Sequence, residues 1–283
     1  MRIVNLRLDE RIVERIDEIS SKLLISRSEV IRQALTLYIS LIENIGFYFK
    51  PSVFSPKLDI YEERNGIYVD LGNNLSLSVF NIVYGGIGEK EGDWLKAGVE
   101  RVAEIMAYQI EVESICRFIQ PLAVELSTGN ELDYGMRFYR RFRELFSGRV
   151  VFADSEDVAK TDQSFFSAVV VGVRDMRVKN IPKRGEKIFL YGRVMRGEEL
   201  LRDNPPDLSV FRRLAEMVKE GKASSIMPVK GDGIRNACIY AASIAGGRLR
   251  MRAEIDGGCP ATAVIVSAEE MPLEGGVEVG EIL

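Results

Sequence analysis

Three short stretches of the chain carry side chains of the kind that bind phosphate or metal ions. The first is a glycine-rich loop, in which Gly86 and Gly88 precede Lys90 directly after an apolar run. Glycines let backbone N–H groups approach a phosphate or nucleotide closely, and a following lysine meets its charge. The loop lacks the GxxxxGKS/T spacing of a P-loop, so a flexible hairpin end is the competing interpretation.

The second stretch is a run of acidic residues after GRVVFAD, in which Asp154 and Glu156 are the candidate metal ligands. Carboxylate oxygens suit Mg²⁺, which bridges phosphates, while a solvated acidic turn is the alternative. The third is Lys230-Gly231-Asp232-Gly233, ahead of an apolar helical run. Its simplest interpretation is a helix start capped by Asp232.

The chain contains no histidine, which excludes histidine-based triads, general bases and metal ligands. Its three cysteines are far apart in sequence and show no paired spacing, so they predict neither a disulfide framework nor a zinc site. The net charge of −4 means that any contact with nucleic acid must be local. No apolar run is long enough for a bilayer and the start lacks a signal peptide's apolar core, so we expect a cytoplasmic protein without membrane contact.

Apolar periodicity assigns these stretches to helices and strands. The runs GIYVDLGN and LSLSVFNIVYGG predict a hairpin. Further strands are expected at IQPLAVELS, GRVVFAD, SAVVVGVRD, EKIFLYGRV, LRMRAEID and ATAVIVSAEE, and helices at about 93–108, YGMRFYRRFRELF, LSVFRRLAEMVKEG and GIRNACIYAASIAGG. This mixture predicts an α+β protein with antiparallel or mixed sheets.

Residues 1–43 form a different pattern of one short strand, a helix, a tight turn and a second helix. Apolar residues alternate up to Leu8 and then recur with helical spacing. Ser26 and Glu29 have the spacing of a capping box at the start of the second helix. Because a lone strand leaves its backbone edge without a partner, we expect this unit to dimerise through the strand.

This pattern resembles the ribbon-helix-helix repressors, the group that contains the Arc and Met repressors. The resemblance implies a ribbon in the major groove of double-stranded DNA, with Ile3, Asn5 and Arg7 reading base edges. It also implies a phosphate contact at Arg27 and Ser28, where the second helix begins. A ribbon used only for dimerisation is the alternative. Equal numbers of basic and acidic side chains in residues 1–43 predict weak non-specific affinity.

The stretch from about 60 to 270 resembles the aminoimidazole ribonucleotide (AIR) synthetase superfamily. GGIGEK is similar to that family's DGxGTK, with Lys90 at the lysine, and GDGIRNACIYAASIAGG is similar to its SDGG element. IQPLAVELS, and the passage from VVFADSED to IPKRGEKIFLYG, are similar to the segments between them. The family's aspartate in DGxGTK is Gly85 here, and its Asn-Asp pair is absent from MAYQIEVESICRF. These aspartates hold metal ions against nucleotide phosphates, so the resemblance implies the fold, a dimeric barrel-like interface and a pocket for a nucleotide with Mg²⁺, but not turnover.

We therefore expect an α+β chain with four parts: a ribbon-helix-helix module (1–43), a linker (44–57) and the two lobes of an AIR synthetase-like domain (58–175 and 176–283). The expected function is a homodimeric, or larger, transcriptional regulator that binds operator DNA. Its body would be a degenerate enzyme that supports dimerisation and senses a small-molecule effector. The alternatives are an ATP-dependent enzyme whose amino-terminal module serves oligomerisation, with Lys90, Asp154 and Glu156 in its site, and a scaffold with neither activity.

Overall fold

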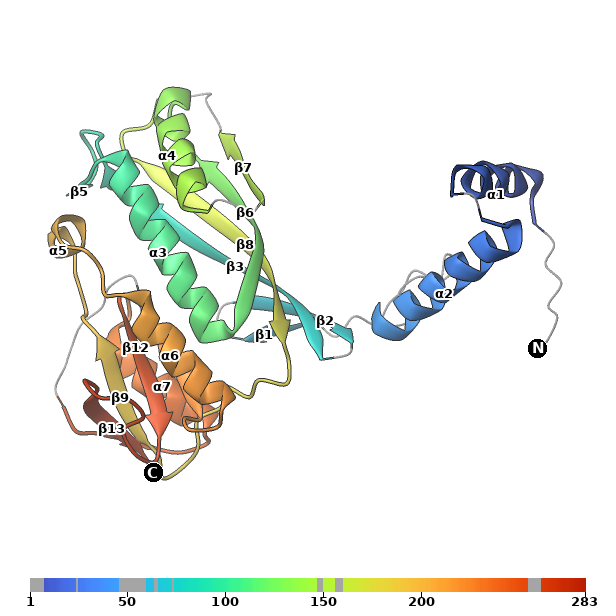
Figure 1. Cartoon of the computed structure of the whole chain (residues 1–283). Helices are drawn as coiled ribbons and strands as arrows, with labels where there is room; N and C mark the ends of the chain where they lie inside the picture. Colours follow the sequence, from blue (N-terminus) through green and yellow to red (C-terminus); the bar gives the residue numbers. More distant parts are fainter. Residues whose placement is uncertain are drawn as a thin grey trace. The chain divides into compact units, whose positions relative to one another are not determined.

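The computed structural model describes residues 8–23, 25–45, 60–63, 66–72, 74–146, 150–155, 160–253 and 261–283. The chain divides into two compact units, Met1–Leu58 with Leu71–Asn73 and Asp59–Asp70 with Asn74–Leu283 (Figure 1). The predicted ribbon residues Ile3, Asn5 and Arg7 lie outside the described residues, as does Glu156. No helix in the described ranges is long and apolar enough to cross a membrane.

The first unit contains two helices, α1 (Glu10–Leu23) and α2 (Arg27–Ile45). The Ser26 hydroxyl caps α2 by accepting a hydrogen bond from the Glu29 N–H at 3.2 Å, which is half of the predicted capping box. The Glu29 carboxylate does not complete the box. It accepts hydrogen bonds from Arg32 and Gln33 on the next turn instead.

The apolar side chains of this helix pair are largely uncovered. Among the side chains described in the first unit, Val30 alone is buried. The large apolar side chains left exposed are Leu8, Ile12, Ile19, Leu23, Leu35 and Ile39. Two helices cannot bury an apolar stripe on each of them without a further surface, and exposed stripes of this kind mark an interface.

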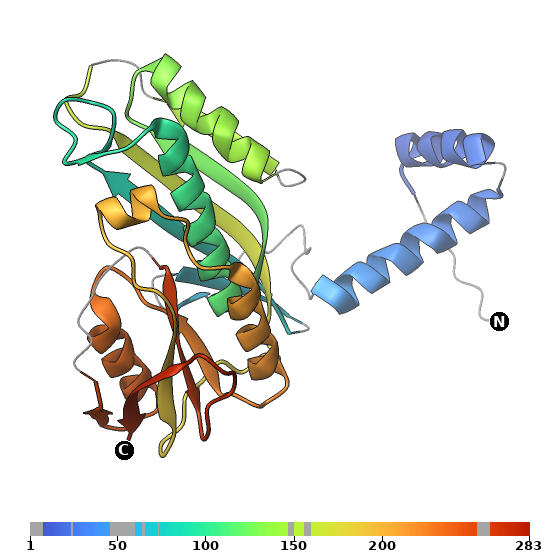
Figure 2. The same ribbon diagram turned by 60° about the vertical axis from the view of Figure 1, so that its left-hand side comes forward.

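The second unit begins with a six-stranded mixed sheet in the order β1-β2-β3-β8-β6-β7, in which β6 and β7 pair in parallel. The strands are β1 (Ile60–Glu63), β2 (Gly66–Gly72), β3 (Leu75–Gly85), β6 (Ile119–Thr128), β7 (Val150–Ser155) and β8 (Phe165–Asp175). Helices α3 (Val99–Arg117) and α4 (Leu132–Leu145) lie on one face of this sheet (Figures 1 and 2). The predicted hairpin and strands of this lobe are present.

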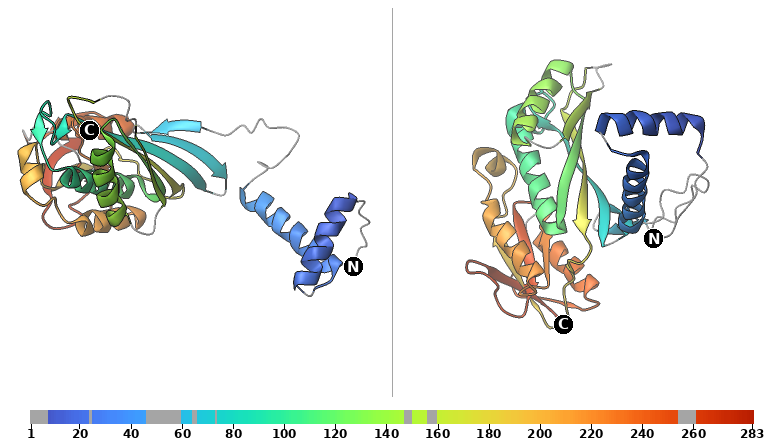
Figure 3. Two further views of the ribbon diagram at one scale, coloured as in Figure 1. Left: turned by 90° about the horizontal axis from the view of Figure 1, so that it is seen from above. Right: turned by 45° about the vertical axis from the view of Figure 1, so that its right-hand side comes forward.

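The opposite face of the six-stranded sheet is apolar and partly exposed. In β8 every second residue is buried against the helices, and the alternate residues Val169, Val171 and Val173 face the other way. Val79 and Val83 of β3 extend this surface, which we call the open sheet face. No helix of the second unit covers it among the described residues, and Figure 3 shows the helices on the other side (right panel). A one-sided sheet normally turns polar residues outward, so valines here are unusual.

The second lobe is a five-stranded antiparallel sheet in the order β10-β12-β9-β13-β11. Helix α6 (Leu208–Lys219) packs with one set of alternating strand residues and α7 (Gly233–Ile244) with the other. The remaining elements are β4 (Ile87–Gly88), β5 (Leu95–Lys96), β9 (Lys187–Gly192), α5 (Glu198–Arg202), β10 (Ser225–Pro228), β11 (Leu249–Met251), β12 (Ala263–Ala268) and β13 (Val277–Ile282). Since both faces are covered, β12 is buried throughout, which explains its continuous apolar run.

Helix α3 joins the two lobes because it contributes to both cores. Val102 and Met106 pack in the first core, whereas Val112 and Cys116 pack in the second. The helix predicted at about 93–108 therefore begins later and continues to Arg117. Its start is displaced because Asp93 is held in the preceding loop by hydrogen bonds to Lys90 and Ser164.

Candidate functional site

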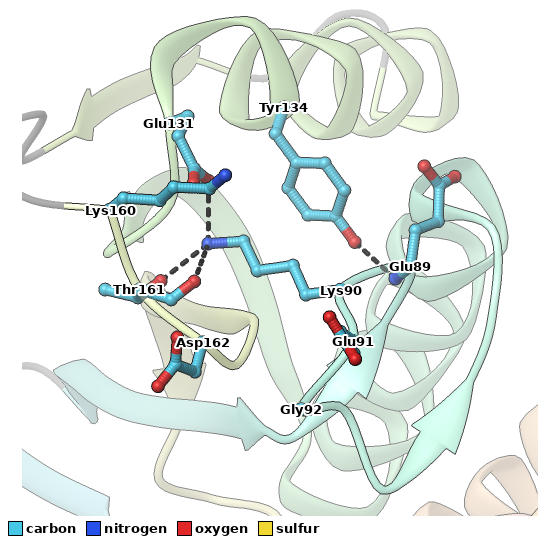
Figure 4. Close-up of a pocket in the computed structure, with 9 residues that line it drawn as sticks. All are labelled: Glu89, Lys90, Glu91, Gly92, Glu131, Tyr134, Lys160, Thr161 and Asp162. Carbon is cyan, nitrogen blue, oxygen red and sulfur yellow. Dashed lines mark hydrogen bonds and ion pairs between the residues drawn. The ribbon is translucent and has the colours of Figure 1, made fainter.

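The predicted phosphate loop lies at the edge of an open pocket of about 660 Å³ in the first lobe. We call it the Lys90 pocket. It is lined by Glu89, Lys90, Glu91, Gly92, Glu131, Tyr134, Lys160, Thr161 and Asp162 (Figure 4). The loop supplies the first four residues, the start of α4 the next two, and the segment before β8 the last three. Gly86 and Gly88 support the loop from behind and do not line the pocket.

The Lys90 ammonium group already has partners within the protein. Its Nζ lies 2.7 Å from the Glu131 carboxylate and donates hydrogen bonds to the Thr161 hydroxyl at 2.5 Å and carbonyl at 3.2 Å (Figure 4). The hydrogen bond from Lys90 lowers the pKa of Glu131 below its ordinary value. A phosphate at Lys90 would have to compete with Glu131 for a charge-assisted contact.

The loop itself is fixed by a buried carboxylate. Asp93 accepts hydrogen bonds from the Lys90 N–H at 2.8 Å, the Ser164 N–H at 2.6 Å and the Ser164 hydroxyl at 2.7 Å. A Cβ atom at Gly88 would collide with Ser164 and with the Tyr134 hydroxyl. Gly86 has a φ of +70°, which favours glycine. Packing and backbone conformation therefore account for the glycines without a ligand.

A second ion-pair network closes the pocket against α3. Glu89 accepts a hydrogen bond from the Val99 N–H at 3.1 Å and so caps that helix. The Arg137 guanidinium bridges Glu89 at 2.9 Å and Glu100 at 2.8 Å. Hydrogen bonds from Arg137 lower the pKa values of both carboxyl groups from 4.5. The network therefore favours the ionised form of each carboxyl group.

Replacing Arg137 with methionine should reduce stability only where these carboxyl groups are ionised. Their folded-state pKa values are lowered, so their contribution is present above the unfolded value of about 4.5 and is lost as the pH falls through the folded values. At pH 7 the loss in unfolding free energy should be below about 1 kcal/mol, because solvent screens the half-exposed groups. Urea unfolding at a series of pH values should show this difference shrinking below about pH 4.

The matched control is Arg140→Met, because Arg140 is exposed on the same helix and has no ion pair among the described contacts. It should change stability equally little at every pH. A difference for Arg137→Met that stays constant into acid would contradict the electrostatic role of the network.

The carboxylates nearest Lys90 do not fit a magnesium ion. Glu131 is paired with Lys90, Glu89 with Arg137, and Asp93 with three hydrogen-bond donors. Within the described ranges, no three His, Cys, Asp or Glu side chains come together as a metal site would require. Asp154 lies in β7 opposite Ser127 of β6. Its predicted partner Glu156 lies outside the described residues, so this pair of ligands remains a prediction.

A second pocket, of about 480 Å³, opens beside the third stretch singled out from the sequence. We call it the Lys230 pocket. Its polar lining includes Glu62, Glu113, Arg117, Lys230, Asp232 and Asn236, and its apolar lining Met227, Pro228, Ala237 and Tyr240. Residues 227–240 belong to the second lobe, whereas Glu113 and Arg117 belong to α3. The glycine-flanked stretch is thus more than a helix start.

A buried carboxylate joins the two sides of the Lys230 pocket. The Glu113 side chain is 3% exposed and lies 2.9 Å from Arg117 Nε and 3.0 Å from Lys230 Nζ. Arg117 is equally buried and stacks over the Phe80 ring at 5.0 Å. Two cations therefore neutralise one carboxylate in the pocket wall.

Sequence reasoning missed Glu113 and Arg117, although a signal was present. They stand four residues apart in the helix, and the run IEVESICRF around them is otherwise mostly apolar. Charges on an apolar helix segment are buried only when they are paired. The pair could have been inferred, but its approach to Lys230 could not.

The start of α2 is where the first unit was predicted to hold a phosphate. The Arg27 side chain forms an ion pair with Asp17 of α1 and is 63% exposed, while Ser28 occupies the second position of the helix. An exposed ion pair contributes little stability, so Arg27 can exchange Asp17 for a phosphate at small cost. These two residues remain predicted contacts.

Comparison with known protein families finds one match by sequence. Residues 2–41 match the family described as ribbon-helix-helix protein, copG family. No curated protein matches the chain. The match covers α1, most of α2 and the predicted ribbon.

The fold of the second unit is found in several solved structures. AaThiL complexed with AMPPCP and TMP is 17% identical, has a TM-score of 0.54 and covers 77% of this chain and 84% of its own. Thiamine-monophosphate kinase from Stenotrophomonas maltophilia K279a is 12% identical, with a TM-score of 0.56 and coverages of 80% and 89%. T. maritima PurL complexed with AMPPCP is 14% identical, with a TM-score of 0.52 and coverages of 77% and 37%. The chain therefore combines a ribbon-helix-helix segment of the CopG family at its amino end with a two-lobed α+β body of the AIR synthetase-like fold.

Proposed function

We propose that this chain is a homodimeric DNA-binding transcriptional regulator whose AIR synthetase-like body is catalytically degenerate. The body supports dimerisation and senses a small molecule. The observation that carries the proposal is the family match at residues 2–41, together with a helix pair that leaves its apolar side chains uncovered. A second copy of the same unit would cover those side chains and pair the two ribbon strands.

The open sheet face supports dimerisation of the body as well. Val79, Val83, Val169, Val171 and Val173 form one continuous apolar surface on adjacent strands. Two such faces packed together would form a closed interface around a two-fold axis. A two-fold axis in the body would hold two ribbon strands at the same symmetry, which is what a pseudo-palindromic operator requires.

The Lys90 pocket supports the degenerate character of the body. Stabilisation of phosphoryl transfer depends on metal ions and free cations aimed at the transferring group. Here Lys90 is paired with Glu131, and Asp93 accepts three hydrogen bonds from the loop and its neighbour. These groups stabilise the loop and are occupied before any nucleotide arrives.

Replacing Arg7 with alanine tests DNA recognition. Arg7 and Asn5 are the proposed base-reading residues, Ile3 lies between them and the amino end, and Arg27 and Ser28 are the proposed phosphate contacts. Loss of one bidentate base contact costs about 1–3 kcal/mol, so affinity for the operator should fall by about 10-fold to 100-fold. Fluorescence anisotropy with the DNA upstream of the gene measures this loss. Arg15→Ala, an exposed change on α1, is the matched control.

If Arg7→Ala binds the upstream DNA with the same affinity and the same sequence preference as Arg15→Ala, the base-reading role is wrong. If the unaltered chain shows no preference for any DNA sequence, the regulator proposal as a whole fails.

An ATP-dependent enzyme is the alternative, since AaThiL and PurL have been solved with AMPPCP bound. In that case the amino-terminal unit would serve oligomerisation, and Lys90, Asp154 and Glu156 would belong to the active site. Release of ADP or AMP from ATP that requires Mg²⁺ and is lost in Lys90→Ala would support the enzyme over the regulator.

A further inference from the structure

The Lys230 pocket combines features of a small-molecule site that the Lys90 pocket lacks. Its floor is apolar, with Met227, Pro228 and Ala237, and the Tyr240 ring is 41% exposed at its side. Small-molecule sites are typically apolar pockets of a few hundred Å³ with a few converging polar groups. The volume of about 480 Å³ falls within that range.

The charged groups of the pocket leave one cation available to a ligand. Arg117 contacts one oxygen of Glu113, and Lys230 contacts the other. Lys230 is 34% exposed and Glu113 is its one contact among those described, so at least one of the three ammonium hydrogens remains for a ligand. The adjacent start of α7 has no side-chain cap from Asp232. The ammonium group and the uncapped helix end therefore both favour an anionic group at the same place.

We propose that the Lys230 pocket binds a small metabolite that has a single carboxylate or phosphate monoester group, held by Lys230 without a divalent metal. The remainder of the ligand is neutral or cationic and lies between Tyr240 and the apolar floor. This names the ligand class for the sensing role in the proposed function, and only its regulatory consequence rests on that function.

Two properties of the pocket exclude the metal and limit the charge of the ligand. Glu113 is the buried carboxylate in the wall, and both of its oxygens already contact cations. Glu62 and Asp232 also line the pocket, so its ionisable side chains are three carboxylates and two cations. A polyanion such as ATP would be repelled by the surplus carboxylate, whereas a single anionic group can lie beside Lys230.

Isothermal titration calorimetry on the full chain tests the proposal with four probes, namely inorganic phosphate, AMP, acetate and ATP, each in EDTA and in MgCl₂. The phosphate and acetate arms distinguish a phosphate ligand from a carboxylate ligand. Lys230→Met removes the proposed contact. Lys222→Met is the matched control, because it breaks an exposed ion pair with Glu220 at 2.7 Å away from this pocket.

The expected result is binding of a phosphate or carboxylate probe that is unchanged by EDTA and at least tenfold weaker in Lys230→Met than in Lys222→Met. AMP should bind more tightly than ATP. Binding that requires Mg²⁺, equal affinity in the two lysine variants, or no binding of any probe would overturn the proposal. DNA binding measured without ligand is a separate readout, so failure here and failure of the regulator proposal can be told apart.

Discussion

Replacing Arg117 with methionine should lower the free energy of unfolding by about 3–5 kcal/mol, because it leaves the Glu113 carboxylate buried beside the lost charge. Both side chains are 3% exposed and 2.9 Å apart. Burial lowers the pKa of the Arg117 guanidinium and Glu113 raises it, with a net upward shift, so the pair is ionised in the folded protein. Lys230 contacts the other carboxylate oxygen and cannot replace the lost contact. Urea unfolding at pH 7 measures the effect.

Two further variants separate charge from packing. Glu113→Gln combined with Arg117→Met removes both charges and should recover part of the lost stability, since no uncompensated carboxylate remains. Arg177→Met breaks an exposed pair with Asp175 at 2.6 Å and should behave like an ordinary surface substitution. If Arg117→Met were as stable as Arg177→Met, the buried pair would not contribute to the stability of α3.

Most elements of the body could be predicted because their apolar residues follow one dominant surface. The alternating valines of β8 and the continuous apolar run of β12 reflect one-sided and two-sided burial, and both strands lie where they were expected. The short strands β10 and β13 were not predicted. Their partners are distant in sequence, and β13 contains an irregularity between Glu278 and Gly280 that breaks its alternation.

The sites were harder to predict because their partners come together only in the folded chain. The loop at Gly86, Gly88 and Lys90 does border a pocket, as expected from its composition. That Lys90 would be held by Glu131 and Thr161 depends on the placement of α4 and of the segment before β8. Local sequence carries no information on that placement, so a binding lysine and a structural lysine look the same.

The same limit applies to the Lys230 pocket. The sequence indicated a helix start at Asp232, and α7 does begin at Gly233. Glu113, more than a hundred residues earlier, converts that helix start into one wall of a pocket. Burial of a charged pair in α3 is a tertiary event, because it requires the second lobe to pack against the end of that helix.

The largest expected change in assembly is that of Val171→Lys at the centre of the open sheet face. Val171 lies on β8 between Val79 of β3 and Ala123 of β6, with its side chain opposite to the helix-covered core. In a dimer that packs these faces together, each copy would bury a lysine against the other. Burial of unpaired like charges costs several kcal/mol, so the dimer dissociation constant should rise on the order of 1000-fold.

Sedimentation equilibrium on the full chain measures this constant, and circular dichroism shows that the variant is folded. The amino-terminal units can still pair, but within one closed dimer the two interfaces act together, so loss of the body contact weakens the whole. Val210→Lys is the matched control, because Val210 is an isolated exposed valine on α6. Equal dissociation constants for the two variants would mean that the open sheet face is not the dimer interface. The ribbon would then have to hold the two copies together unaided.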